Sequence, residues 1–301
     1  MYFLPAGNRT GHHRCNDFHH RIHKGLAVIK HAACAGVFLA LSGMACAETD
    51  MLEAVRSRNS SELGLTLSHY DYQEPSVDVR MTALNIGIEY QRTHALSGDR
   101  FWTAGVDYAY GPDSYSGSGN LIVPKYYYNL KLAVGKDLFY DTYVLSPYVG
   151  LGYRFLSQAG GGLATSSGAY FYDRQSSYFY LPLGVKRRIA VSGGAQFETT
   201  VEYDHLLMGN QYSGLSVADN WGYSDSSNVN NRQTTGYGLN ASVMYRRPDG
   251  WSFGPYWKYW NISASDSATW TYKKSGTTYS VSAWEPANTT DEFGFKAMYK
   301  F

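Results

Sequence analysis

Three histidines follow the first 47 residues, and two of them stand beside a residue that could act with an imidazole in catalysis. Ser68-His69 pairs a hydroxyl with a base, Asp204-His205 pairs a carboxylate with a base, and His94 stands alone. A nucleophile or an orienting acid must lie within hydrogen-bonding reach of its base. Adjacent residues on a β-strand point to opposite faces, so neither pair can meet if it lies on a strand. With no GxSxG, HExxH or phosphate-binding loop present, the sequence predicts no enzyme, no cofactor and no metal site.

Charged residues form a second pattern, because they recur on the polar side of segments in which polar and apolar residues alternate. Glu198, Glu202 and Asp204 share one such side, while neighbouring segments carry Lys186 and Arg246. Opposite charges that face one another across a narrow interior would form a salt-bridged plug, and a selective ring in a small pore is the alternative. The full charge network expected inside the molecule is Glu89, Asp107, Lys131, Arg154, Lys186, Glu198, Glu202, Asp204, Arg246, Lys258 and Lys296.

The elements that would position these charges are strands. Apolar and polar residues alternate with period two in ten segments, most of them ten residues or longer, whereas globular strands usually run to five or six. No stretch of comparable strength has a helical period. The apolar sides of these segments begin at Leu63, Leu84, Trp102, Tyr126, Leu145, Phe179, Phe197, Tyr237, Trp251 and Phe293.

The connections between the segments differ in length on the two sides. THALSGD, KDLFYD, RRIAVSGG and RRPDG are short, while most of the alternate connections are much longer. Short turns on one side and long loops on the other are typical of a transmembrane β-barrel. In hydrocarbon every backbone N–H and C=O needs a partner, and closing the sheet supplies one. The sequence therefore predicts an all-β, antiparallel transmembrane barrel of about ten strands over residues 61–301.

Two features complicate the strand pattern. Pro147, Pro182 and Pro255 fall inside expected strands, where each removes a ladder hydrogen bond, and we expect bulges or register breaks there. The stretch TWTYKKSGTTYSVSAW also alternates, but its arms are too short for the ~9–11 residues that a crossing strand needs. We expect it to form a hairpin above the membrane, and counts of eight or twelve strands stay open.

The first 47 residues have the layout of a secretory signal peptide. Lys24 and Lys30 precede the apolar run AACAGVFLALSG, and Ala45-Cys46-Ala47 follows as a cleavage site. The run is shorter than the roughly 20 residues that span a bilayer. A buried helix or a lipid on Cys46 are the alternatives. We expect cleavage after Ala47, with Ala45 and Ala47 as the small residues of the cleavage site, so that residues 1–47 are removed. Glu48 would then begin the mature chain, and residues 48–60 would form a short periplasmic tail.

Composition narrows the partners of the mature chain. From Glu48 onward it contains no cysteine, and 21 lysines and arginines face 24 aspartates and glutamates, a net charge of −3. No disulfide or cysteine-based metal site is expected there, and a nucleic-acid partner is not expected either.

The end of the chain resembles the outer-membrane β-barrel proteins of Gram-negative bacteria. Phe301 closes the chain with Phe293, Phe295 and Tyr299 on the same side, which is similar to the C-terminal signal that this family presents to its assembly machinery. LSPYVGLGYRFL also resembles a strand of small opacity-type and OmpA-like barrels. The resemblance implies a monomer in the outer membrane, with outer-membrane lipids, lipopolysaccharide and the barrel-assembly machinery as partners.

The long loops indicate the role that such a barrel would have. They are rich in Ser, Tyr, Asn and Gly, as in NWGYSDSSNVNNR, a composition that suits adaptable contact surfaces. We expect a structural, surface-binding or adhesive role toward an extracellular ligand or host surface. A narrow porin-like channel for small solutes is the second hypothesis. An outer-membrane enzyme acting on lipid or peptide is the third, although Asp204-His205 departs from the Asp-x-His unit of the omptin proteases.

Overall fold

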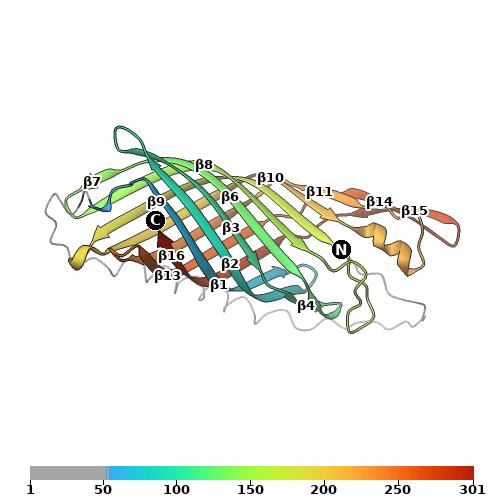
Figure 1. Ribbon diagram of the computed structural model, residues 1–301. Helices are drawn as coiled ribbons and strands as arrows, with labels where there is room; N and C mark the ends of the chain where they lie inside the picture. The colour runs from blue at the N-terminus through green and yellow to red at the C-terminus, as the bar shows by residue number, and fades with distance from the viewer. Residues whose placement is uncertain (1–51, 53) are drawn as a thin grey trace, which may run out of the picture.

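The computed structural model describes Leu52 and residues 54–301, which form a closed antiparallel barrel of ten strands (Figure 1). Each strand pairs with its neighbour along the chain, and the last one returns to pair with the first, with Leu67 opposite Phe295. The ten-stranded barrel predicted from the sequence is confirmed, and the counts of eight and twelve are wrong. The barrel strands are β1 (Ser60–Glu74), β2 (Val79–Ala95), β3 (Arg100–Tyr110), β6 (Lys125–Lys136), β8 (Tyr143–Gln158), β9 (Arg174–Ala190), β10 (Gln196–Ser213), β12 (Gly236–Arg246), β13 (Trp251–Ile262) and β16 (Asn288–Lys300).

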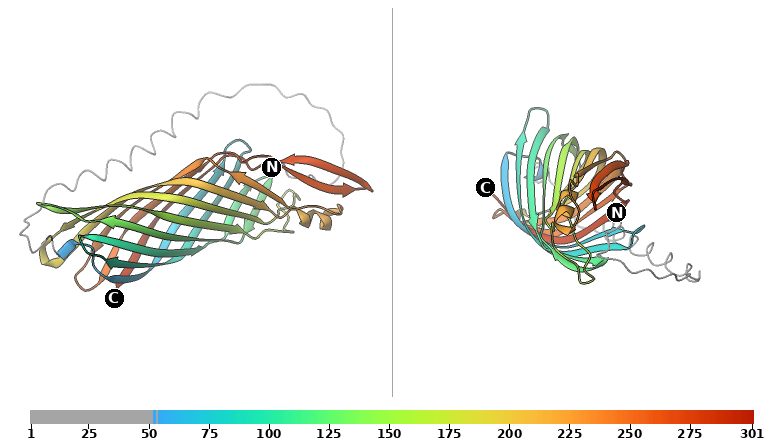
Figure 2. Two further views of the ribbon diagram at one scale, coloured as in Figure 1. Left: turned by 90° about the horizontal axis from the view of Figure 1, so that it is seen from above. Right: turned by 90° about the vertical axis from the view of Figure 1, so that its right-hand side faces the viewer.

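The two ends of the barrel carry different connections. At one end, here called the turn end, short turns link β2 to β3, β6 to β8, β9 to β10 and β12 to β13. The other end, here called the loop end, carries most of the additional structure, including a hairpin that extends beyond the barrel (Figure 2). In an outer-membrane barrel short turns face the periplasm and long loops face the exterior. The additional elements are β4 (Asp113–Gly117), β5 (Gly119–Val123), β7 (Leu138–Tyr140), β11 (Val229–Gln233), β14 (Ala268–Lys274), β15 (Thr277–Ala283) and the 3-10 helices η1 (Ser192–Gly194) and η2 (Leu215–Trp221).

The hairpin expected in TWTYKKSGTTYSVSAW is confirmed as the two strands β14 and β15, which form a sheet of their own. Its turn lies at Ser275 and Gly276, whose φ angles are 51° and 79°. Positive φ at both central residues is the type I′ geometry, whose twist matches that of the flanking strands.

The three prolines do not break the register of the barrel. Pro147 stands opposite Val185 and Pro255 opposite Phe295, in registers that continue unchanged on both sides. Pro182 likewise keeps the pairing of β9 with β10. The register shift lies elsewhere, between Leu206 and Met208 in β10. Pairs are missing beside Pro182 in the β8–β9 ladder and beside Pro255 in the β12–β13 ladder, but both registers resume unchanged, so the bulges and register breaks expected at the prolines were wrong.

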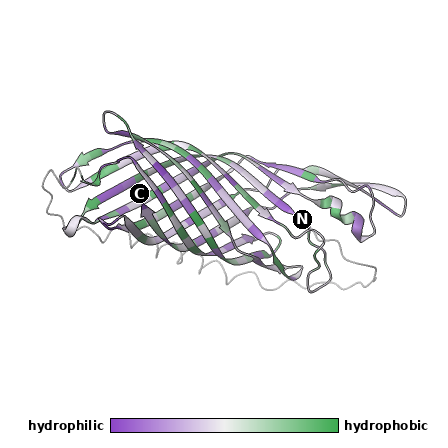
Figure 3. Ribbon diagram, viewed as in Figure 1, coloured by the Kyte–Doolittle hydropathy of each residue, from purple (hydrophilic) through white to green (hydrophobic). Residues whose placement is uncertain are grey.

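The two faces of the barrel wall differ in polarity, and Figure 3 shows the alternation along the strands. Outward-facing aliphatic side chains are exposed to a degree unusual for a folded protein, with Leu65 and Ile86 each 65% exposed. Aromatic rings contact one another along the same outer wall, as Tyr128 and Phe155 do at 5.2 Å between ring centroids. An apolar outer wall on a closed barrel is the surface that lipid covers.

The described N-terminal residues lie against the turn end. Val55 is buried, and the Ser57 hydroxyl donates a hydrogen bond of 2.9 Å to Asp137. Arg56 pairs with Asp99 at 2.6 Å. The signal-peptide prediction and its cleavage residues, Ala45, Ala47 and Glu48, lie outside the described residues. Among the described residues, no helix has both the length and the apolar character needed to cross a membrane.

Candidate functional site

The middle of the barrel lumen is organised around Glu202 of β10. Its two carboxylate oxygens each lie 2.8 Å from Nζ of Lys131, which reaches across from β6. Tyr148 and Asn240 donate further hydrogen bonds to it at 2.7 and 3.2 Å. The Glu202 side chain is only 3% exposed. A buried carboxylate of this kind is stable only with such partners, so the group holds β6, β8, β10 and β12 to one another.

Asp204 lies next to this centre on the same inward face. Its Oδ2 accepts a hydrogen bond of 2.6 Å from Asn240, whereas its buried Oδ1 has no partner among the described residues. Asn240 thus bridges Glu202 and Asp204, two carboxylates that share one amide.

A second group of charges lies toward the turn end, around Glu198. Arg188 donates from Nε at 2.8 Å and Arg246 from Nη2 at 2.9 Å, one to each carboxylate oxygen. Arg246 also pairs with Glu62 of β1 at 2.7 Å. Because Arg188 lies on the sixth barrel strand and Glu62 on the first, which are opposite one another in the ring of ten, this chain of pairs spans the lumen.

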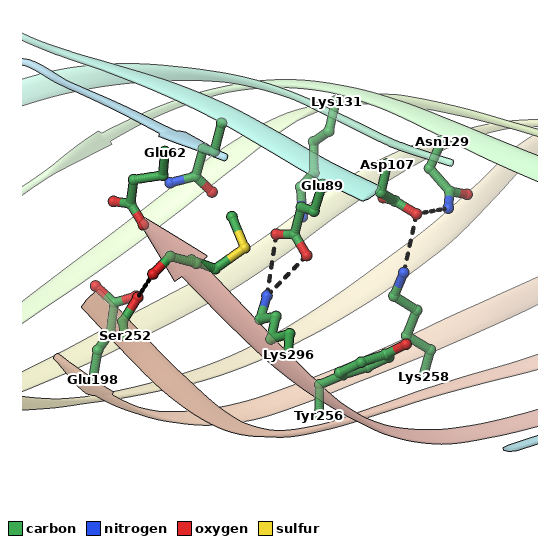
Figure 4. A network of polar contacts seen from close by, with 12 residues as sticks. Glu62, Glu89, Asp107, Asn129, Lys131, Glu198, Ser252, Tyr256, Lys258 and Lys296 are labelled. Carbon is green, nitrogen blue, oxygen red and sulfur yellow. Dashed lines mark hydrogen bonds and ion pairs between the residues drawn. The ribbon is translucent and has the colours of Figure 1, made fainter. Parts of the chain in front are cut away.

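Two further pairs cross the lumen near its middle, as Figure 4 shows. Lys296 of β16 lies 3.1 Å from both carboxylate oxygens of Glu89. Lys258 of β13 lies 3.1 Å from Asp107 of β3. All four side chains are about one-fifth exposed, so these pairs are less deeply buried than Glu202. They brace the β2–β3 wall against β13 and β16.

Toward the loop end of the lumen, the charged side chains contact aromatic side chains in place of opposite charges. Glu292 is buried and accepts hydrogen bonds from Tyr127, Tyr256 and Ser68 at 2.7 to 3.0 Å. The Arg154 guanidinium lies 4.6 Å from the ring centroid of Tyr127 and 5.9 Å from that of Trp260. A cation held near aromatic ring faces is favourable, and Arg154 and Trp260 line both the middle cavity and a small one beyond it.

The free space inside the barrel decreases from the turn end to the loop end. A cavity of about 540 Å³ at the turn end adjoins one of about 150 Å³ in the middle, since both are lined by Glu62, Lys186, Glu198 and Arg246. Arg154 also lines a small cavity of about 20 Å³ on its loop-end side, and Arg174 lines another of about 10 Å³ near the loops. A space of 20 Å³ has room for roughly one water molecule.

A separate buried cluster closes the loop end. Arg174 at the start of β9 lies between two carboxylates, 2.6 Å from Glu74 and 2.9 Å from Glu285. Nearby, Asp113 of β4 pairs with Lys125 at 2.7 Å, and neither side chain is exposed to solvent. Burial raises the pKa of the Asp113 carboxyl above its ordinary value, although the lysine beside it acts in the opposite direction. These contacts hold the loop segments against the barrel rim.

The eleven residues of the predicted charge network all line the 150 Å³ cavity. The structure brings ten of them into direct polar contacts, through Lys296–Glu89, Lys258–Asp107, Lys131–Glu202, Arg246–Glu198, Arg154–Asn129 and Asp204–Asn240. Lys186, by contrast, makes no hydrogen bond or ion pair with any described residue, and Asp204 meets an amide and no base.

Sequence reasoning missed several members of the lumen network. Arg188 was assigned to the turn RRIAVSGG, whereas β9 continues as a strand to Ala190 and directs Arg188 inward. Glu62 lies at the very start of β1, before the alternating pattern is established. Glu292 is not among the eleven predicted residues, and its partners Tyr127 and Tyr256 are aromatic and carry no charge signal.

The sequence neighbours of His69 and His205 lie on the opposite side of the barrel wall from these histidines. His69 and His205 are exposed on the outer wall, while their neighbours Ser68 and Asp204 are buried inside it. His94 lies within β2, not in a turn as the sequence suggested, and packs 5.6 Å from the ring of Trp102. In the described part of the chain no three His, Cys, Asp or Glu side chains group in a way that could hold a metal ion.

The four residues of the expected assembly signal lie on the outer face of β16 and just beyond it. Phe293, Phe295, Tyr299 and Phe301 are between 42% and 67% exposed, on the wall that lipid would cover. Their role in assembly stays a prediction.

Comparison with known proteins finds similarity in fold but no match in sequence. No protein-family model matches the sequence, and no curated protein matches it. Among solved structures, the chain is similar to the outer membrane protease OmpT from Escherichia coli, at 9% identity over 82% of this chain and 98% of that one, with a TM-score of 0.48. It is also similar to Neisserial surface protein A (10% identity, 80% and 97% covered, TM-score 0.33). An outer membrane channel from Pseudomonas putida F1 is a third (11% identity, 85% and 99%, TM-score 0.39).

These three proteins differ in kind, being a protease, a surface protein and a channel, so the likeness assigns no activity. The class follows from the molecule itself: a closed barrel, an apolar outer wall and a charged interior. The chain is an outer-membrane β-barrel protein.

Proposed function

We propose that this protein is a non-conducting barrel that carries a binding surface on its extracellular loops. The observation that supports this most directly is the contrast between the cavities of about 540 and 150 Å³ on the turn-end side of Arg154 and the cavity of about 20 Å³ that Arg154 and Trp260 line beyond it. A barrel that served as a pore would need a continuous passage, and beyond Arg154 the space holds roughly one water molecule.

The nature of the obstruction supports a permanent closure. Glu202, Glu198 and Glu292 are each held by partners from other strands, so that opening the lumen would leave a buried carboxylate unpaired. Breaking such a buried pair is costly because the remaining charge stays in a low-dielectric environment. The lumen contacts therefore stabilise the barrel, and in this proposal the binding function lies in the extracellular loops.

The loop end has the features of a supported platform. Arg174 ties Glu74, at the loop end of β1, to Glu285 of the last loop. Above it, rings stack between loops, as Tyr170 and Trp221 do at 4.6 Å between centroids and 5° between planes. Aromatic side chains with few rotatable bonds, set among serines and asparagines, suit contact with another surface.

In this proposal the barrel acts as a monomer and has no catalytic role. Its neighbours are outer-membrane lipids and lipopolysaccharide, and the barrel-assembly machinery handles its last strand. An extracellular ligand or host surface is the partner of the loops, reached after export through a cleaved signal peptide.

The experiment is a recording of the refolded barrel in a planar bilayer. We expect no steady conductance steps from the wild type. The Arg154→Ala variant, which removes the side chain between the cavities of about 150 and 20 Å³, is recorded in parallel to test whether Arg154 alone blocks the passage. Steady steps from the wild type would overturn the proposal.

A narrow channel for small solutes is the second candidate, and one observation favours it. The turn-end and middle cavities share lining residues, so the lumen is continuous from the periplasmic side as far as Arg154 and Trp260. Only the section of the lumen on the loop-end side of Arg154 and Trp260 would have to open for a solute to pass. The same recording decides between the two functions.

A further inference from the structure

The hairpin β14–β15 has one covered edge and one open edge. On the β14 side, residues of the preceding loop add backbone hydrogen bonds: Ser224 and Lys273 exchange two, at 2.7 and 3.0 Å, and Ser227 donates one of 2.8 Å to Thr271. The loop therefore acts as a third, partial strand that satisfies the backbone of β14.

On the other side, β15 pairs with β14 and with no other strand in the described part of the chain. Its residues Thr277 to Ser282 are all exposed. The strand reads TTYSVSA, without a charge, a proline or a bulge. Natural proteins use those devices to protect an edge, because an unpaired row of N–H and C=O groups accepts another strand. This edge has none of them.

The geometry of the turn determines which groups the open edge presents. In a hairpin with a two-residue turn the closing pair, here Lys274 and Thr277, is hydrogen-bonded across the hairpin. The backbone groups of Thr278, Ser280 and Ser282 therefore point away from β14. An antiparallel partner strand centred on Ser280 would form roughly six hydrogen bonds with them.

The strand is complementary to a second copy of itself in that register. Ser280 would face Ser280, Thr278 would face Ser282, and Tyr279 would face Val281 of the other copy. Aromatic with β-branched and hydroxyl with hydroxyl are favourable cross-strand pairs. Since the strand has no charge, its self-pairing opposes no like charges, and the exposed sides of Tyr279 and Val281, 43% and 39%, would become covered.

We propose that β15 pairs antiparallel with β15 of a second copy of this chain on a facing membrane, so that the protein joins one cell surface to another. Figure 2 shows the hairpin extending beyond the barrel along its length. Two copies in one membrane hold β15 in parallel directions, whereas copies on facing membranes hold it antiparallel, as the register requires. This inference rests on the proposed surface-binding function and names its partner.

The test uses the purified full chain in liposomes carrying two fluorescent labels, with clustering followed by energy transfer and light scattering. Wild-type liposomes should cluster. Ser280→Lys places two like charges opposite one another at the centre of the pair, and we expect a loss of clustering rate of at least about tenfold. Ser280→Glu should lose as much. Mixing lysine-bearing with glutamate-bearing liposomes should restore clustering, which also shows that both variants are folded.

Thr269→Lys is the matched control, because it adds the same charge to the exposed polar side of β14, away from the open edge. It should cluster as the wild type does. Absence of clustering by the wild type, an unaffected Ser280→Lys variant or no rescue on mixing would each overturn the inference. Clustering that needs another protein would show that the edge takes a different partner, which also overturns it. A silent bilayer recording together with no clustering would remove this inference and leave the proposed function intact.

Discussion

The lumen of the barrel and the hairpin at its loop end use charge in opposite ways. In the lumen, ion pairs join residues that are far apart in sequence, such as Lys131 with Glu202, and the carboxylate is buried. The hairpin has one pair, Lys273 with Asp225 at 2.6 Å, whose side chains are 45% and 67% exposed. Buried pairs commit distant strands to one arrangement, while exposed pairs of this kind contribute little.

The barrel wall and the hairpin also differ in how completely their strands are paired. Barrel closure leaves each of the ten strands with two partners, so the lumen wall has no free edge. The hairpin keeps β15 open. The pairing that stabilises the fold is thus complete where the chain crosses the membrane, and the binding that we propose uses the edge where pairing is incomplete.

The largest effect is expected from Glu202→Ala. It removes the acceptor of Lys131, Tyr148 and Asn240 together, and because the Lys131 left behind is 37% exposed we expect a loss of roughly 3 kcal/mol in the free energy of unfolding, the lower end of the range for breaking a buried pair. The measurement is the urea midpoint of the barrel refolded in detergent, with the m-value checked for constancy.

Glu202→Gln is the control for shape, because it keeps hydrogen-bonding capacity without the charge. It should lose less stability than Glu202→Ala. If both midpoints equal that of the wild type, the lumen is solvated at this position, and the contrast with the hairpin would disappear.

A smaller effect is expected when a charge is placed on the wrong face of the wall. Leu132 lies one residue from Lys131 but points outward, 54% exposed. Leu132→Arg should cost about 2–4 kcal/mol near the middle of the bilayer, where lipid cannot solvate a guanidinium. Thr103→Arg is the matched control, because it points into the turn-end cavity of about 540 Å³. Folding yield in liposomes should fall for the first variant only, and equal yields would contradict the assignment of faces.

The face of each lumen residue could be predicted from sequence, because one physical rule decides it. A strand alternates sides, so an apolar run such as Leu130, Leu132 and Val134 places Lys131 inside without knowledge of any contact. The fold followed from the same rule applied ten times, together with the alternation of short and long connections.

The pairing of those residues could not be predicted, since alternation says nothing about depth or partner. Arg188 was lost because the end of β9 was placed too early, and strand ends are not marked by period two. Glu292 accepts hydrogen bonds from the phenols of Tyr127 and Tyr256, and alternation does not predict such partners. The contacts of the loops depend on how segments such as residues 224–227 fold back, and no local pattern in the sequence records that.

An intermediate case sharpens the comparison between buried and exposed pairs. Glu89 and Lys296 are 21% and 17% exposed, between Glu202 and the hairpin pair. We expect Glu89→Gln to cost about 1 kcal/mol, the upper end of the range for solvent-accessible pairs. The urea midpoint again measures it, at low and at high salt. A loss as large as that of Glu202→Ala would show that the contribution of these ion pairs to stability does not depend on how deeply they are buried.

The smallest effect is expected from Asp225→Ala on the hairpin. A hydrogen bond and the charge of Asp225 raise the pKa of Lys273 above its ordinary value of 10.5. A raised lysine pKa contributes stability below the unfolded value and loses it as pH rises through the folded one. Because the pair is exposed, we expect no measurable change in the unfolding midpoint at neutral pH. The change should instead be local, with the Lys273 pKa, followed by NMR of the labelled side chain, returning toward 10.5 in the variant. A lowered global midpoint would show that the hairpin is coupled to the barrel as tightly as the lumen pairs are, and would remove the distinction between a closed wall and an open edge.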